Sequence, residues 1–146
     1  MENNKLTDLK EERILQQEHS NFLWTTSWAS LASSVCALYN KYYIFSCFDF
    51  SIFLSSLNYW RHPAYGLRRN IDITLVYASL LYQSYRALQS QYARKHFSVL
   101  FIGMMCYPMS IYYFKKKQYW LSTYFHSGVH IFGNLSYIVL YSGPHF

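Results

Sequence analysis

The sequence predicts an all-α fold, specifically a polytopic membrane helix bundle of about five transmembrane helices with a cytosolic N-terminus. Two observations support this prediction. Charged residues make up only 14% of the 146 residues, against about 25% in ordinary soluble domains, whereas aromatic residues make up 21%. The few charges are also clustered, so that five long stretches carry almost none. The same composition excludes an intrinsically disordered chain, because such chains are rich in charge and poor in aromatic residues.

The first 20 residues are expected to form a polar tail or a short amphipathic helix, followed by a single transmembrane domain over 21–146. Five of the seven acidic residues lie in this tail. Apolar residues at Leu6, Leu9 and Ile14 have a spacing that allows a short helix with one apolar face. A basic segment ahead of a short apolar core is missing, which speaks against a cleaved signal peptide.

The five predicted spans cover about 21–39, 42–60, 71–88, 97–114 and 119–142. A helix of about 19 residues is roughly 28 Å long, close to the hydrocarbon thickness of a bilayer. The polar residues in the spans are mostly Ser, Thr and Tyr, which suit contacts between helices in lipid. The span ends carry tryptophans that we interpret as interfacial anchors, namely Trp24, Trp28, Trp60 and Trp120. Asp49, near the middle of the second span, has to be neutral or paired.

Lysine and arginine in the short loops set the predicted orientation. With five spans, nine basic residues share a side with the N-terminus and four lie on the other side. The nine are Lys5, Lys10, Arg13, Arg61, Arg68, Arg69, Lys115, Lys116 and Lys117. The net charge of +6 therefore follows from topology, and no soluble basic face is left for nucleic acid. We expect membrane lipids and other membrane proteins as partners, in the endoplasmic reticulum or another internal membrane.

Four residues are candidates for a metal site. His126 and His130 are four positions apart on the fifth span, so both imidazoles lie on one helix face at a spacing that can chelate a transition metal. At about 1.5 Å per residue His126 lies roughly 14 Å deep, and His130 lies one turn further, near the midplane. His62 and Asp72 flank the loop on the same side of the membrane. Such a set can hold a zinc ion and leave one position for water, although histidines with hydroxyl partners at helix contacts are the commoner arrangement.

These positions are similar to the zinc site of the superfamily of alkaline ceramidases, adiponectin-type receptors and related membrane hydrolases. That pattern has a Ser and a His one turn apart on one helix, an Asp soon afterwards on the next, and HxxxH on the last. Here His62, Asp72 and the pair of His126 and His130 occur in this order, with Asn58 in the place of the Ser. The superfamily has seven helices, whereas this chain supports five.

The resemblance implies a zinc-dependent hydrolase of lipid amides. His62, His126 and His130 would be zinc ligands, Asp72 a ligand, orienting group or base, and Asn58 an oxyanion donor. A second class stays open, a non-enzymatic membrane subunit or scaffold whose helices contact lipid or partner proteins. A transporter is less favoured because the spans show no internal repeat. Three cysteines without a CxxC pair predict neither a disulfide framework nor a further zinc site.

Overall fold

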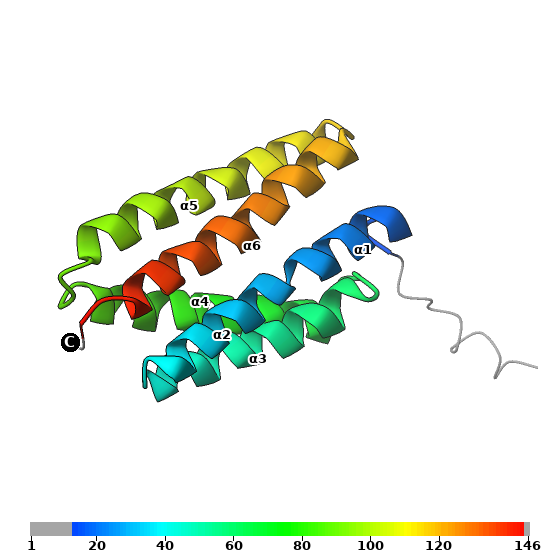
Figure 1. Ribbon diagram of the computed structural model, residues 1–146. Helices are drawn as coiled ribbons and strands as arrows, with labels where there is room; N and C mark the ends of the chain where they lie inside the picture. Colours follow the sequence, from blue (N-terminus) through cyan, green and yellow to red (C-terminus); the bar gives the residue numbers. More distant parts are fainter. Residues whose placement is uncertain (1–12, 145–146) are drawn as a thin grey trace, which may run out of the picture.

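The computed structural model of the protein describes residues 13–144, which form six helices and no β-sheet (Figure 1). The helices are α1 (Gln17–Thr26), α2 (Trp28–Tyr39), α3 (Tyr43–Trp60), α4 (Leu67–Ala87), α5 (Ala93–Lys115) and α6 (Tyr119–Tyr141). The prediction of an all-α fold is confirmed.

Helices α1 and α2 lie end to end, so the six helices make five rods (Figure 1). The break falls at Ser27, whose hydroxyl donates to the backbone carbonyl of Leu23 at 2.9 Å. A serine that bonds back by one turn in this way often bends a helix. The five rods match the five predicted segments, although α4 begins at Leu67 rather than 71 and α5 at Ala93 rather than 97. Charged residues end an apolar span, but they do not by themselves end a helix.

The N-terminal tail is only partly inside the described residues. There, the backbone N–H of Ile14 donates to the carbonyl of Pro63 at 2.9 Å, which ties the segment to the loop after α3. Residues 13–16 are not helical, and most of the segment expected to form a polar tail or a short amphipathic helix lies outside the described residues. Helix α1 begins at Gln17, which moves His19 from the predicted tail into the bundle.

The five rods are arranged as a row that does not close on itself. Helices α5 and α6 form an antiparallel hairpin, α6 packs on the α1–α2 rod, this rod packs on α3, and α3 packs on α4 (Figure 1). Within residues 13–144, α4 and α5 are joined by a short loop but do not pack together along their lengths. Helices α4 and α5 form the two ends of the row, so the sides that they turn towards each other are free to line a cavity.

Glycine lets α5 and α6 approach closely at one point. A Cβ atom placed on Gly103 would lie 3.2 Å from the backbone nitrogen of Gly133, on the facing helix. A Cβ atom placed on Gly133 itself would meet nothing within 4 Å. Small residues at such crossings are typical of helix packing in membranes. A side chain at Gly103 would therefore press against α6, whereas a side chain at Gly133 would have room.

This difference gives a stability prediction. Gly103→Leu forces a side chain against the backbone of α6, and overpacking of this kind costs about 1–3 kcal/mol. Gly133→Leu adds the same side chain over open space and is expected to leave the unfolding midpoint nearly unchanged. Thermal unfolding of the detergent-purified variants, followed by circular dichroism, measures both. Equal losses in the two variants would contradict the close approach at Gly103.

Large apolar side chains cover the outside of the bundle, and polar side chains fill much of its inside. Every helix exposes large hydrophobic residues, such as Val35, Leu54, Leu81 and Phe101. Among the described residues, the buried polar side chains are mostly serines. A soluble domain shows the reverse, and extensive exposed apolar surface marks contact with lipid or protein. By length and composition, α5 is the one helix of the described chain that qualifies as a membrane span on its own.

A ladder of hydrogen bonds joins α6 to the α1–α2 rod. The Nδ1 atom of His19 lies 3.3 Å from the Thr123 hydroxyl, and the Nδ1 atom of His130 lies 3.0 Å from the Thr26 hydroxyl. One step further, the Ser33 hydroxyl donates to Oδ1 of Asn134 at 2.8 Å. Partners on α1 and α2 recur every seventh residue, so one face of this rod supplies the whole ladder.

Asp49 sits in a second polar cluster, at the end of the bundle where α3 begins and α6 ends. It is 1% exposed and accepts hydrogen bonds from Nε2 of Gln83 at 2.8 Å and from the Tyr141 hydroxyl at 2.7 Å. The Gln83 amide also donates to the Ser79 hydroxyl at 2.7 Å. Asp49 is thus held by hydrogen bonds, which agrees with the expectation that it is neutral or paired, and the cluster connects α3, α4 and α6.

Candidate functional site

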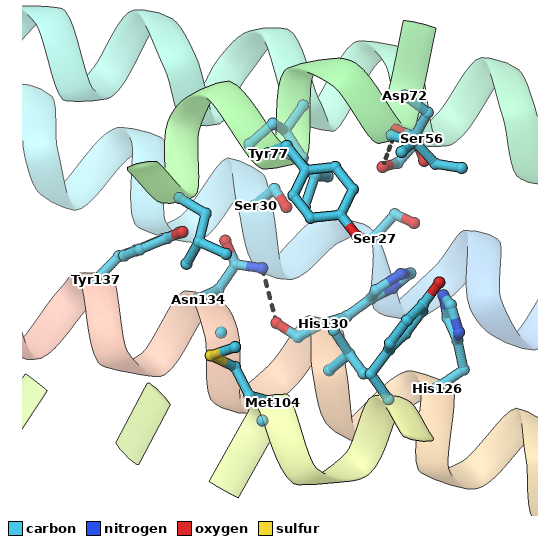
Figure 2. A pocket seen from close by; sticks show the side chains of 18 of the residues that line it. Ser27, Ser30, Ser56, Asp72, Tyr77, Met104, His126, His130, Asn134 and Tyr137 are labelled. Carbon is cyan, nitrogen blue, oxygen red and sulfur yellow. Dashed lines mark hydrogen bonds between the residues drawn. The ribbon is translucent and has the colours of Figure 1, made fainter. Parts of the chain in front are cut away.

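A cavity of about 250 Å³ lies between α4, α5 and α6 (Figure 2). Helix α4 contributes Asp72, Ile73, Val76, Tyr77 and Leu80, α5 contributes Leu100, Gly103, Met104 and Tyr107, α6 contributes His126, Val129, His130, Gly133, Asn134 and Tyr137, and the floor consists of Ser27, Ser30, Ile52 and Ser56. The lining residues of each long helix recur every three or four positions, so each helix turns one face to the cavity.

The cavity has an apolar, exposed rim and a polar, buried floor. On the rim, Val76, Tyr77 and Met104 are between 38% and 55% exposed. The three serines of the floor are 4% exposed or less. Because the exposed lining comes from α4 and α5, the cavity opens between these two helices, towards the apolar outer surface.

Asp72 is the acid of this cavity. Its Oδ1 atom accepts a hydrogen bond from the Ser56 hydroxyl at 2.6 Å (Figure 2). The same atom accepts a hydrogen bond from the Ser55 hydroxyl at 2.7 Å, so the carboxyl group is fixed against α3. The side chain is buried, at 8% exposure. Its second oxygen, Oδ2, accepts no hydrogen bond from residues 13–144, and the residue lines the cavity.

The two histidines predicted as a pair lie side by side on α6. Their ring centroids are 5.3 Å apart, at an angle of 77°. The Thr26 hydroxyl orients the ring of His130, as described for the ladder. His126 has no such partner, since its side chain makes no hydrogen bond with any residue that the structure describes. The imidazole of His126 and the carboxyl group of Asp72 therefore line the same cavity, and each has an atom without a hydrogen-bond partner in residues 13–144.

Trp60 closes the group from the last turn of α3. Its indole ring lies 5.1 Å from the ring of His126 and 6.1 Å from that of His130, measured between centroids. The side chain is 5% exposed. Interpreting Trp60 as an interfacial anchor was therefore wrong, because the ring is buried against two imidazoles.

The predicted zinc ligands are not assembled. Asp72, His126 and His130 line one cavity, but His62 lies in the turn after α3, outside the lining. No group of three His, Cys, Asp or Glu side chains in residues 13–144 lies close enough together to hold a metal ion. The donor set as arranged does not fit zinc, which in catalytic sites takes three protein ligands. The predicted oxyanion donor Asn58 is on the exposed face of α3, also outside the cavity.

His62 lies outside the cavity because of the point at which α3 ends and the face that this helix turns to the bundle interior. Positions 56 and 60 are four apart and share the face of α3 that points to the bundle interior. His62 comes after the helix has ended, so it cannot continue this face. Ser56, Trp60 and Ser30 are site residues that the sequence analysis missed. The spacing of Ser56 and Trp60 is a signal that could have identified the first two.

No protein-family model, curated protein or solved structure matches the chain. The similarity to the zinc hydrolases thus rests on the order of four residues alone.

Proposed function

We propose that the chain is a multi-pass membrane protein that binds a lipid with one hydrocarbon chain and a hydrogen-donating head group. The observation that carries this proposal is the cavity, with its apolar rim between α4 and α5 and the polar groups of Asp72 and His126 inside. Its lining has the composition typical of ligand pockets, which are mostly apolar with a few placed polar groups.

The distribution of side chains supports the membrane setting. The outside of every helix is rich in large apolar residues, and serines fill the inside. Five rods of nearly the same direction are what a polytopic bundle requires, and the excess of basic residues on one side favours a cytosolic N-terminus. In this setting the space between α4 and α5 faces acyl chains.

The size of the cavity supports a ligand with one chain. Its volume of about 250 Å³ is slightly below the range of ligand pockets, which span roughly 300–1,000 Å³. Such a volume takes a head group and the first few methylenes. The rest of the chain would extend past Val76 and Met104 into the bilayer.

The hydrogen-bonding groups of Asp72 and His126 restrict the chemistry of the head group. A carboxylate oxygen accepts hydrogen bonds and cannot give one, so Oδ2 of Asp72 favours a hydroxyl, an amine or an amide N–H. The imidazole of His126 can donate or accept, according to its tautomer. A head group with acceptors only leaves Asp72 unsatisfied, and a buried unsatisfied group costs about 1–3 kcal/mol.

Binding is favoured over lipid amide hydrolysis. Hydrolysis of the predicted kind needs a zinc ion, and the described residues provide no three-ligand group for it. The alternative of a scaffold without a ligand does not explain why Asp72 and His126 both turn hydrogen-bonding groups to the cavity. We therefore keep the lipid contact that the sequence predicted as a partner, and propose it as the function.

A photolabelling experiment tests the proposal. Long-chain probes with a diazirine in the chain and an alcohol, amine or methyl ether head are incorporated into nanodiscs with the full chain. We expect the alcohol and the amine to label α4 and α5 at least tenfold more than the ether, which corresponds to about 1.4 kcal/mol. Peptide mapping by mass spectrometry locates the label.

Variants of Asp72 sharpen this test. Asp72→Asn replaces the free acceptor with a donor amide and is expected to abolish the preference for the alcohol. Asn58→Ala, on the exposed face of the adjoining helix, is the matched control and should keep it. Uniform labelling of all helices by all probes, together with a co-purifying protein partner, would favour the scaffold and overturn the proposal.

A further inference from the structure

An open cleft of about 380 Å³ lies at the end of the bundle where α1 and α6 both begin (Figure 1). Its lining comes from Gln16, which precedes α1, from His19 in the first turn of α1, and from Lys117 and residues 118–121 at the start of α6. None of these residues lines the cavity between α4, α5 and α6, so the cleft is a separate feature. The three lysines at 115–117 put it on the side predicted to be cytosolic.

The first turn of α6 brings free backbone donors to the cleft. The N–H groups of Tyr119, Trp120 and Leu121 make no hydrogen bond with residues 13–144, and Gln118 before them provides no side-chain cap. All four residues line the cleft. Free N–H groups at the start of a helix, together with the helix dipole, favour a negative charge, and phosphate groups often bind there.

Lys117 adds a full positive charge at the same end of α6. Its backbone closes the turn between α5 and α6, because its N–H donates to the carbonyl of Phe114 at 2.9 Å. Its φ angle of 58° lies in the left-handed region. Asn adopts this conformation more readily than most residues with a side chain. The charge can therefore be removed by Lys117→Asn without disturbing the turn.

His19 brings a buried imidazole to the start of α6. The side chain is 3% exposed, and its ring centroid lies 4.4 Å from that of Trp120 and 6.2 Å from that of Tyr119. The Thr123 hydroxyl donates to the carbonyl of Tyr119 at 2.8 Å, so in its contact with Nδ1 of His19 the ring is the donor. The other nitrogen, Nε2, makes no hydrogen bond with residues 13–144 and is not sealed inside the protein. His19 therefore presents a nitrogen without a partner at the wall of the cleft.

We infer that this cleft binds a phosphate group. Phosphate oxygens accept hydrogen bonds from the free N–H groups of α6 and from the ammonium group of Lys117. Nε2 of His19 accepts from a phosphate O–H when the ring is neutral and donates to a phosphate oxygen when the ring is charged. The nearest acidic residue in the sequence, Glu18, is exposed and lies outside the lining.

A lipid head group and free phosphate share this chemistry. Basic pockets on the cytosolic side of membrane bundles bind phosphate-bearing head groups, which makes the lipid the first source to test. The inference concerns a second ligand and stands whether or not a lipid occupies the cavity between α4, α5 and α6.

Native mass spectrometry of the full chain in detergent tests the inference. The probes are short-chain phosphatidic acid and short-chain phosphatidylcholine, in which a quaternary ammonium group accompanies the phosphate. We expect one phosphatidic acid per chain, bound about tenfold more tightly than phosphatidylcholine, a factor that corresponds to about 1.4 kcal/mol. An excess of inorganic phosphate distinguishes the two sources. Displacement of the phosphatidic acid identifies free phosphate as a ligand, and retention identifies the lipid head group.

Two lysine variants localise the binding. K117N and K116N each remove one positive charge from the same run of lysines, so they change the overall attraction for anions equally. Only Lys117 lines the cleft, whereas the Nζ atom of Lys116 lies over the ring of Tyr112, 4.5 Å from its centroid. We expect K117N to lose the preference for phosphatidic acid and K116N to keep it. H19N keeps a donor towards Thr123 but lacks Nε2, and should weaken the binding of phosphatidic acid.

Equal losses of binding in K116N and K117N would show that overall charge alone attracts the lipid, and would overturn the inference. Equal binding of phosphatidic acid and phosphatidylcholine by the wild-type protein would do the same. Unfolding midpoints of the variants show whether each one folds. If H19N does not fold, the comparison of the two lysine variants still decides.

Discussion

Asp49→Leu is expected to lower the free energy of unfolding by about 1–3 kcal/mol. The carboxyl group accepts hydrogen bonds from Gln83 and Tyr141. Its loss leaves one amide N–H of Gln83 buried without an acceptor, while the Tyr141 hydroxyl can still donate to the Gln83 carbonyl oxygen. Each orphaned donor costs about 1–3 kcal/mol in proteins generally, although bonds inside membrane bundles average less. Equilibrium unfolding of the detergent-purified protein, followed by tryptophan fluorescence, measures the loss.

Two control variants separate the contribution of the polar cluster to stability from the contribution of side-chain packing. Asp49→Asn keeps an acceptor oxygen and nearly the same shape, and should cost less than half as much. Ser51→Leu makes a comparable change on the same helix outside the cluster, and should have little effect. A D49L protein as stable as D49N would show that the cluster contributes nothing to stability.

Gly133→Leu is expected to reduce photolabelling by the alcohol probe at least tenfold while the protein stays folded. Gly133 lines the cavity, and a side chain there meets no neighbouring atom within 4 Å of its Cβ. A leucine side chain would therefore fill space that the ligand needs. Labelling at α4 and α5 in nanodiscs measures the loss.

The matched control enlarges a side chain on the outside of the same helix. Leu135 is 42% exposed and is not part of the cavity lining. Leu135→Phe should label as wild type does. Undiminished labelling of a folded G133L protein would place the lipid elsewhere on the surface and would contradict the proposed function.

The helices could be predicted because the sequence separates charged from uncharged segments. Four of the five predicted segments correspond to one helix each, and the first corresponds to the α1–α2 rod. The break at Ser27 could not be predicted, because a serine in an apolar helix is compatible with a straight or a bent course. The role of His19 was missed for another reason. The charges around it suggested a tail, but a charged neighbour does not keep a residue out of the bundle.

The site was predictable in part. Counting residues from the predicted membrane surface grouped Asp72, His126 and His130, and these three residues line one cavity. That count gives depth but not the direction of a side chain around its helix. His62 has the right depth and is still outside the cavity, whereas Trp60 has the right direction. The opening of the cavity between α4 and α5 could not be predicted from the sequence. Which pairs of helices pack together depends on how all the helices are arranged.

Helices α4 and α5 do not pack along their lengths in the described part of the chain, and this gives the proposed lipid binding a thermodynamic consequence. A ligand that enters sideways never leaves the lipid phase, so its aqueous solubility does not limit access. Occupancy is then governed by the mole fraction of that lipid in the bilayer, and affinity has no useful meaning in molar units. A change in membrane composition alone would thus load or empty the protein.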